Sequence, residues 1–153
     1  MSSHTPRTVA VSGGFDPVHI GHVRMFNEAR ALGDRLVVII NNDHWLRQKK
    51  GFVFMPETER KEIIEAFRAV DEVVLSGHGQ HPTDMSVADD LRAIKPDVFA
   101  NGGDRKADEV DLPPKEYVVC EELGIEMVFN VGRGGKVQSS SDLVKAAKEK
   151  GMR

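Results

Sequence analysis

The sequence has a single cysteine, a single tryptophan and a single tyrosine among its 153 residues, and it contains no long apolar run. Cys120 has no second cysteine with which to form an internal disulfide, and no apolar signal segment is evident. Both features favour a reducing, cytoplasmic setting. Because no apolar stretch approaches the roughly 20 residues of a membrane-spanning helix, we expect no membrane partner.

The charge of the chain shows little excess of either sign, with 21 basic and 24 acidic residues and a formal net charge of −3. Nucleic-acid binding normally needs a basic surface, so we expect no nucleic-acid partner. Hydrophobic residues make up 40% and charged residues 29%, which is typical of a globular chain. The length fits one domain, which we expect over residues 7–153, after a short flexible leader at residues 1–6.

Short apolar runs rich in β-branched residues alternate with segments of helical periodicity. The runs are typical of strands buried on both faces and comprise Val9–Val11, Leu36–Ile40, Val73–Leu75, Val98–Ala100 and Met127–Phe129. The expected helices are Ile20–Leu32, Glu57–Val70, Val87–Ile94, Lys115–Leu123 and Ser141–Lys150, with Pro56 at a first helical position and Gly33 and Gly124 at C-caps. This alternation predicts an α/β fold: a single Rossmann-like, doubly wound parallel sheet of about five strands with helices on both faces.

The segment after the first strand, GGFDPVHIGH at residues 13–22, is rich in glycine and histidine. In such folds ligands bind at the carboxyl ends of the strands, and Gly13 and Gly14 allow a ligand to approach closely. His19 and His22 share one face at the start of a helix, whose N-terminus favours anions. Two imidazoles and backbone N–H groups suit a polyphosphate whose charge grows during a reaction. The alternative is a histidine pair that caps the helix or binds a metal ion.

The same segment resembles the G-x-F-D-x-x-H-x-G-H signature of the cytidylyltransferase-like nucleotidyltransferases, which include glycerol-3-phosphate cytidylyltransferase and pantetheine-phosphate adenylyltransferase. The tetrad HIGH also occurs in class I aminoacyl-tRNA synthetases, but those are much longer and carry tRNA-binding domains. The resemblance covers nearly the whole chain and implies that His19 and His22 are catalytic. It also implies a nucleotide-binding loop in which Asp16 orients the chain; its residues are Gly13, Gly14, Phe15, Asp16 and Gly21.

Two further segments resemble motifs of this family. RKEIIEAFRAVDEVV at residues 60–74 is similar to its R-x-x-I/L…V-D-E-V stretch, in which the arginine corresponding to Arg60 points into the site. Arg60 is therefore a candidate substrate-binding residue, with a solvated helix charge as the alternative. KPDVFANGGDR at residues 95–105 resembles the D-V-x-x-x-G-D segment that closes the fourth strand. We expect Gly102 and Gly103 to admit the nucleotide and Asp104 to order the loop or contact the nucleotide; a plain turn is the alternative.

Near the end of the chain, GRGGKVQSSSDLV resembles the R-x-x-G-x-S-T-T/S signature that opens the family's final helix. Ser139, Ser140 and Ser141 predict a helix N-cap on any interpretation, and serine hydroxyl groups at a helix N-terminus can also bind phosphate. The resemblance implies that Ser140 and Ser141 contact the β- and γ-phosphates of a nucleotide, with Arg133 and Ser139 in the same site. The sequence departs from the family in the longer insert at residues 136–138.

A basic cluster of Arg47, Lys49 and Lys50 lies in what we expect to be the loop after the second strand. A loop at that end of a strand reaches the ligand site, and a solvated run of charges is the alternative. In relatives a lysine from this loop holds the transferred and acceptor phosphates. The resemblance therefore implies a catalytic role for Lys49 or Lys50, between which the spacing does not choose.

Together these motifs predict an enzyme that transfers a nucleotidyl group from an NTP to a small phosphorylated acceptor and releases pyrophosphate. The acceptor oxygen would attack in line, without a covalent enzyme intermediate. We expect Mg²⁺ bound mainly through the NTP phosphates, because no residues forming a dedicated metal cage are evident. The overall form of the sequence resembles glycerol-3-phosphate cytidylyltransferase and other small cytidylyltransferases, which favours CTP as the nucleotide. The alternatives are an adenylyltransferase that uses ATP on a sugar phosphate such as heptose 1-phosphate, since NGGDR resembles such enzymes, and a non-catalytic nucleotide-binding module.

Relatives of this size commonly form homodimers, and we expect a homodimer here. Trp45, Phe52, Val53, Phe54 and Met55 crowd a segment that should lie near the surface. Exposed apolar clusters often mark interfaces, although the same residues could fold over the acceptor site as a lid.

Overall fold

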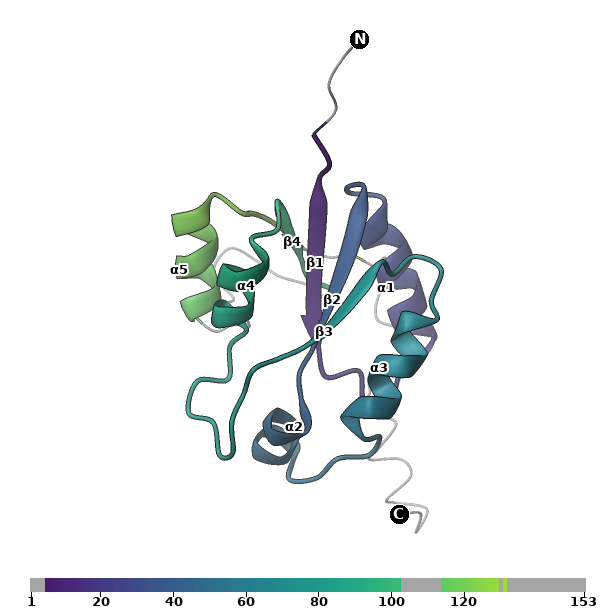
Figure 1. The fold of residues 1–153 in the computed structure, drawn as a ribbon, viewed down its shortest axis with the longest axis vertical. Helices are drawn as coiled ribbons and strands as arrows, with labels where there is room; N and C mark the ends of the chain where they lie inside the picture. Colours follow the sequence, from purple (N-terminus) through teal and green to yellow (C-terminus); the bar gives the residue numbers. More distant parts are fainter. Residues whose placement is uncertain (1–4, 103–113, 130, 132–153) are drawn as a thin grey trace.

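The computed structural model describes residues 5–102, 114–129 and 131 of the protein. Its centre is a sheet of five strands (Figure 1): β1 Thr8–Gly13, β2 Arg35–Ile40, β3 Glu72–Leu75, β4 Val98–Ala100 and β5 Glu126–Val128. The strand order is β3-β2-β1-β4-β5, and every neighbouring pair is parallel. The predicted α/β fold is confirmed, and each predicted strand is present. The predicted final helix, Ser141–Lys150, lies outside the described residues.

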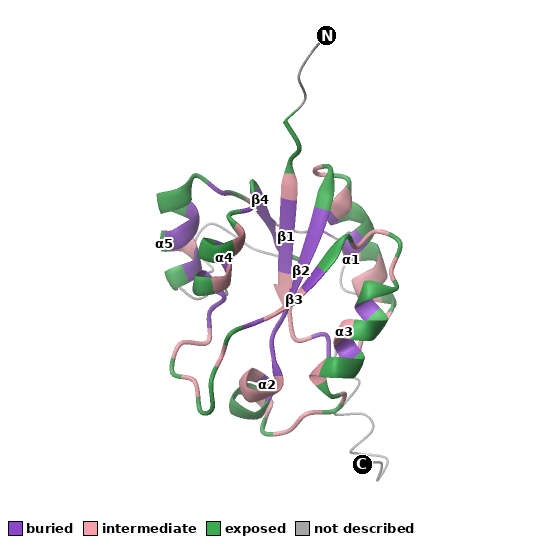
Figure 2. Ribbon diagram, viewed as in Figure 1, coloured by how far each residue is buried: buried purple, intermediate pink, exposed green. Residues whose placement is uncertain are grey.

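Different helices cover the two faces of the sheet (Figure 1). On one face lie α1 (Ile20–Arg30) and α3 (Glu57–Glu65), whose Phe26 and Ile64 pack with Val11 in one apolar cluster. On the opposite face lie α4 (Ala88–Ile94) and α5 (Pro114–Leu123), where Leu91 packs with Phe99 in a second cluster. Because side chains alternate between the faces along a strand, the central strands are buried on both sides (Figure 2).

The order of the strands places a ligand crevice at the carboxyl ends of β1 and β4. The chain runs outward from β1 through β2 to β3 and then crosses to β4 on the other side of β1. In open parallel sheets the connections on either side of such a switch point diverge and leave a crevice outside the carboxyl ends of the strands. The segments that directly follow β1 and β2, and residues 101–102 after β4, therefore lie at this edge.

Helix α2 (Asp43–Lys50) replaces the loop that we predicted after the second strand. The Asn42 side chain accepts a hydrogen bond from the Trp45 N–H group at 3.0 Å and so caps the helix, and Gly51, with a φ of 85°, ends it. Leu46 is the buried residue of α2, so the helix has no apolar periodicity that would reveal it in the sequence. α2 lies beyond the carboxyl ends of the strands (Figure 1).

Three residues were predicted to mark the ends of helices, and the structure confirms one of these predictions and differs from the other two. Gly124 follows α5 with a φ of 68°, as predicted for a C-cap glycine. Gly33 is not a C-cap, because α1 ends at Ala31; a Cβ atom at Gly33 would instead lie 2.6 Å from the Arg7 carbonyl oxygen. Pro56 is the N-cap of α3 rather than its first residue. Among the described residues, no helix combines the length and apolar character needed to cross a membrane.

Candidate active site

His19 and His22 form a reciprocal cap at the N-terminus of α1. The Gly21 N–H group donates a hydrogen bond to His19 Nδ1 at 3.1 Å, and the His19 N–H group donates to His22 Nδ1 at 3.1 Å. The two rings are stacked with centroids 3.8 Å apart. Because Nδ1 accepts in both rings, a neutral imidazole at either position carries its proton on Nε2. The helix-capping alternative is therefore correct, and in both neutral rings the donor group is Nε2–H rather than Nδ1–H.

His22 is held neutral by its surroundings. Its pKa is lowered to about 3 by burial, by the neighbouring His19 and by the charge of Lys50. The ring of Phe15 packs edge-on against the His22 ring with centroids 4.8 Å apart, which fixes the imidazole from the core side. At neutral pH His22 is thus an uncharged hydrogen-bond donor rather than a cation.

Phe15 lies in the core, with 4% of its surface exposed. Its side chain packs against Phe26 as well as His22, so it supports the His22 ring from the core. The same ring explains Gly13, because a Cβ atom at that position would lie 2.8 Å from the Phe15 ring. That Phe15 belongs to the nucleotide-binding loop stays a prediction, which concerns its backbone because its ring is buried.

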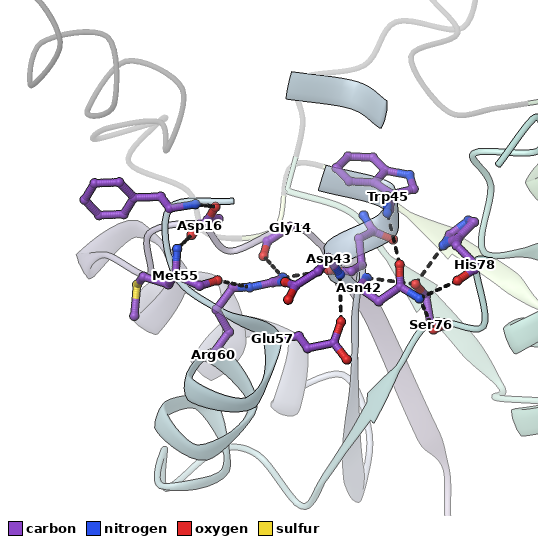
Figure 3. A network of polar contacts seen from close by, with 12 residues as sticks. Gly14, Asp16, Asn42, Asp43, Trp45, Met55, Glu57, Arg60, Ser76 and His78 are labelled. Carbon is purple, nitrogen blue, oxygen red and sulfur yellow. Dashed lines mark hydrogen bonds and ion pairs between the residues drawn. The ribbon is translucent and has the colours of Figure 1, made fainter. Parts of the chain in front are cut away.

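Asp16 ties the first loop to the segment that precedes α3. Its buried carboxylate accepts hydrogen bonds from the Phe54 N–H group at 2.7 Å and from the Met55 N–H group at 2.5 Å (Figure 3). Both oxygens are therefore engaged by the protein. Asp16 orients this loop, and Gly14 beside it packs closely under α2, since a Cβ atom there would lie 3.2 Å from Leu46.

Arg60 is fully buried and is neither a solvated charge nor an arginine that faces an open site. Its guanidinium group donates to the carbonyl oxygens of Gly14 at 2.7 Å, Asn41 at 2.6 Å and Met55 at 2.9 Å, and to the Asp43 carboxylate at 2.7 Å (Figure 3). These groups come from the loop after β1, the end of β2, the start of α2 and the segment before α3. Arg60 thus joins the elements around the site, and its direct contact with substrate stays a prediction.

The N-terminus of α2 has a second anchor that the sequence did not reveal. The Asn42 N–H group donates to Ser76 Oγ at 2.9 Å, and Asn42 Nδ2 donates to the carbonyl oxygens of Ser76 at 2.9 Å and His78 at 2.7 Å (Figure 3). Ser76 Oγ also lies 2.7 Å from His78 Nδ1. Trp45 Nε1 donates to the Met85 carbonyl oxygen at 2.8 Å. An Asn-Asp pair after a strand and a Gly eight residues later are the cap signals that could have indicated this helix.

The structure brings Lys50, and not Lys49, toward the histidine pair. Lys49 is exposed, whereas Lys50 is half-buried at the end of α2. Burial lowers the pKa of Lys50; the charge of Asp16 opposes this effect, and those of Arg60 and Lys49 add to it. Since the charge of Lys50 also lowers the pKa of His22, the lysine and the imidazole share one electrostatic environment.

Several residues predicted for the site lie outside the described residues: Gly103, Asp104, Arg133, Ser139, Ser140 and Ser141. Gly102, at the end of β4, packs closely against α1, where a Cβ atom would lie 2.8 Å from the sulfur of Met25. Within the part of the chain that the structure describes, no group of three or more His, Cys, Asp or Glu side chains is arranged to hold a metal ion. The described site therefore consists of a stacked imidazole pair, a half-buried lysine and a helix N-terminus.

The chain belongs to the cytidylyltransferase-like family, whose sequence model matches residues 10–129. It is accordingly a nucleotidyltransferase. Members of this family bind a nucleoside triphosphate and a phosphorylated acceptor.

The chain is similar in sequence to two relatives and in structure to a third protein. The FAD synthase of Pyrococcus horikoshii is 37% identical over 116 residues, which are 75% of each chain. The bifunctional protein HldE of Koribacter versatilis is 39% identical over 133 residues, which are 86% of this chain and 24% of HldE. The crystal structure of the lipopolysaccharide core biosynthesis protein from Thermoplasma volcanium superimposes with a TM-score of 0.61 at 30% identity, covering 82% of this chain and 94% of that one.

Proposed function

We propose that the protein transfers the adenylyl group of ATP to a small phosphorylated acceptor and releases pyrophosphate. The observation that carries this proposal is the stacked His19–His22 pair at the N-terminus of α1, in which both Nδ1 atoms accept backbone hydrogen bonds. Imidazole Nε2–H donors at a helix N-terminus, one of them on the uncharged His22 ring, suit a triphosphate whose negative charge shifts during reaction. Their geometry is set by the helix cap before any ligand binds.

We propose ATP rather than CTP as the nucleotide because the names of the relatives imply adenylyl transfer. FAD consists of an adenylyl group joined to a phosphorylated flavin, so a protein named FAD synthase makes a bond of the proposed kind. CTP, which the overall form of the sequence favoured, has no support among the relatives named above. Heptose phosphate and flavin mononucleotide are both acceptors of the expected class, since each offers a phosphate oxygen as the attacking atom.

In the proposed reaction an oxygen of the acceptor phosphate forms a bond to the α-phosphorus of ATP. The bond from that phosphorus to the β-phosphate oxygen breaks on the opposite side, and pyrophosphate leaves with the electron pair. Both reactants are anionic, so their approach requires a nearby cation and fixed geometry. Lys50, half-buried near His22, would supply the positive charge. His19 and His22 would donate hydrogen bonds to the phosphate oxygens on which charge accumulates.

Mg²⁺ fits this site as an ion carried by the nucleotide. The described residues offer no carboxylate cluster for it, and the Asp16 carboxylate is occupied by two backbone N–H groups. Phosphate oxygens and water are the ligands that Mg²⁺ keeps in such sites. When bound to the triphosphate, Mg²⁺ would neutralise part of the charge on the leaving pyrophosphate.

The test is a matrix of ATP, CTP, GTP and UTP against flavin mononucleotide, glycerol 3-phosphate and a set of sugar 1-phosphates, with pyrophosphate release as the readout. We expect release with ATP and at least one acceptor, and no release from ATP without an acceptor. Release only with CTP would contradict adenylyl transfer while keeping nucleotidyl transfer. Binding of nucleotide without release for any pair would instead favour the non-catalytic module.

A further inference from the structure

Two buried side-chain atoms at the carboxyl edge of the sheet have no hydrogen-bond partner among the described residues. They are Oδ1 of Asn41 and Nδ2 of Asn101, and the two residues are 6% and 7% exposed. Buried polar atoms in folded proteins are almost always paired, because leaving them unpaired destabilises the fold. One unpaired amide atom directly after each of two strands therefore indicates groups that pair with a ligand.

The two asparagines occupy matching positions on either side of β1. Asn41 directly follows β2 and Asn101 directly follows β4, and these are the two strands that flank β1. The Asn41 N–H group donates to the Gly13 carbonyl oxygen at 2.8 Å, and the Asn101 N–H group donates to the Val128 carbonyl oxygen at 2.7 Å. Both residues thus continue the hydrogen-bonded ladders of the sheet, so their backbones are fixed at the switch point between β1 and β4.

Strand alternation places both side chains over the same face. Ile39 and Phe99, two residues before each asparagine, belong to the apolar cluster under α4 and α5. With a side-chain period of two, Asn41 and Asn101 project to that face as well, and so does Ser12 of β1, two residues after Ala10 of the same cluster. The edge of the sheet therefore carries an amide, a hydroxyl group and an amide in neighbouring strands.

The chemistry of this row matches an uncharged ligand with hydroxyl groups. Asn41 offers an acceptor and Asn101 a donor, and a hydroxyl group can both donate and accept. Neighbouring strands lie about 4.8 Å apart, so the ends of β2 and β4 lie roughly 10 Å apart. A sugar or polyol with hydroxyl groups at both sides can span that gap with two hydrogen bonds of about 2.9 Å each.

We propose that Asn41 and Asn101 bind hydroxyl groups of a substrate at the carboxyl end of β1, one asparagine on each side of the ligand, where they determine specificity for a ribose or a polyol. This inference rests on the proposed function in that ATP supplies a ribose and the phosphorylated acceptor supplies a polyol. The histidine pair binds the phosphates, and the asparagines select the hydroxylated part attached to them. The two unpaired atoms destabilise the protein without ligand, and a bound ligand would pair both of them.

The experiment measures binding by calorimetry in two matched pairs of ligands, without turnover. The first pair is ATP and 2′,3′-dideoxy-ATP, and the second is glycerol 3-phosphate and n-propyl phosphate, which lacks the hydroxyl groups. The variants are Asn41→Leu and Asn101→Leu, which keep the side-chain volume, and the control is Asn27→Leu on the exposed side of α1. If Asn41→Leu or Asn101→Leu does not fold, the serine variant at the same position is used instead.

We expect the wild type to bind the hydroxylated member of one pair about 3- to 10-fold more tightly per hydrogen bond. Each asparagine variant loses that preference and retains the affinity for the deoxy ligand, and its Tm is unchanged or higher because an unpaired polar group is removed. A preference within the ATP pair identifies the ribose, and one within the second pair identifies the acceptor.

The proposal is overturned if the wild type shows no preference in either pair, or if the preference survives in both variants. A lower Tm in both leucine variants with an unchanged preference would make the amides structural, with water as their partner. Because only equilibrium binding is measured, a failure of adenylyl transfer would leave these preferences intact, so the two proposals can fail separately.

Discussion

At the scale of single residues, His19 and His22 combine two tasks that use different atoms of each ring. Their Nδ1 atoms accept the backbone hydrogen bonds that begin α1, and in the proposed reaction their Nε2–H groups donate to the phosphates. The low pKa of His22, caused first by burial, keeps this division constant through the neutral and mildly acidic range. A substitution can therefore remove the Nε2–H donor while retaining the cap.

Asparagine is the substitution that separates the two tasks, because its side-chain oxygen can still accept a capping hydrogen bond. We expect His19→Asn and His22→Asn each to lower kcat by about 10²–10³, as for the loss of one donor to a transition-state anion, with little change in ATP affinity. Steady-state kinetics and calorimetry measure the two effects. His→Ala variants should show the same loss of kcat and an added loss of stability of about 1 kcal/mol from the cap. Near-normal turnover in either asparagine variant would remove that histidine from the mechanism.

Lys49 and Lys50 form a matched pair in which only the burial differs, since they are neighbours at the end of α2. Lys50→Ala should reduce kcat/KM by about 10- to 150-fold, the effect of losing a hydrogen bond to a charged group. Lys49→Ala should leave kcat/KM within twofold of the wild type, because an exposed cation is screened by solvent. Equal effects of the two substitutions, or a larger effect at Lys49, would contradict the placement of Lys50 at the reacting phosphates.

At the scale of elements, the site depends on how α2 and the segment before α3 are held against the end of the sheet. The Arg60 guanidinium group bonds to all of these parts, and Glu57 Oε1 accepts a further hydrogen bond from the Asp43 N–H group at 2.8 Å. Asn42 joins the same helix to Ser76 and His78. The charge of Lys50 acts on His22 from a fixed helix, because buried polar contacts hold the start of α2 and the Gly51 cap ends it.

Arg60→Met should lower the free energy of unfolding by roughly 3–5 kcal/mol, as expected when one partner of a buried ion pair is removed. The control is Lys61→Met, which breaks an exposed ion pair with Glu65 and should cost no more than about 0.5 kcal/mol. Urea denaturation measures both. If Arg60→Met instead keeps wild-type stability and raises only the KM for the acceptor, Arg60 binds substrate, as the sequence first indicated.

The elements that the sequence predicted are those whose residues follow a local rule. The strands appear as β-branched runs because both faces are buried, and α1 and α3 appear as apolar residues at helical spacing. α2 was missed because Leu46 is its buried residue and its stability comes from Asn42 and Arg60. The partners of Arg60 lie as far away in sequence as Gly14, so no spacing could have revealed that this arginine is buried. For the same reason the sequence could not choose between Lys49 and Lys50.

At the scale of the whole molecule, the homodimer stays a prediction, for which Phe54 is the feature to test. Phe54 is 42% exposed, whereas Trp45, Phe52, Val53 and Met55 are partly buried. Asp16 fixes the backbone beneath Phe54, so its ring protrudes from an anchored segment. Exposed aromatic side chains on rigid segments are suited to interfaces.

Light scattering at micromolar concentration should give a mass near twice that of the 16.9 kDa chain. Phe54→Asp should shift the mass toward the monomer without changing the circular dichroism spectrum. Val118→Asp, at a 50% exposed position on α5, is the control and should leave the mass unchanged. A monomeric wild type would reject the dimer and favour a lid over the acceptor, and a response only to Val118→Asp would place the interface on α5.

The central claim is that the α-phosphorus of ATP is transferred, and isotopic labelling tests it most directly. The protein is incubated with an acceptor from the matrix above and with ATP labelled with ³²P at either the α- or the γ-position. We predict that the α-label appears in the acceptor product and the γ-label in pyrophosphate, and that both products form more slowly by the same factor in His19→Asn and His22→Asn. Transfer of the γ-label to the acceptor, or retention of both labels in bound ATP with every acceptor, would contradict the account.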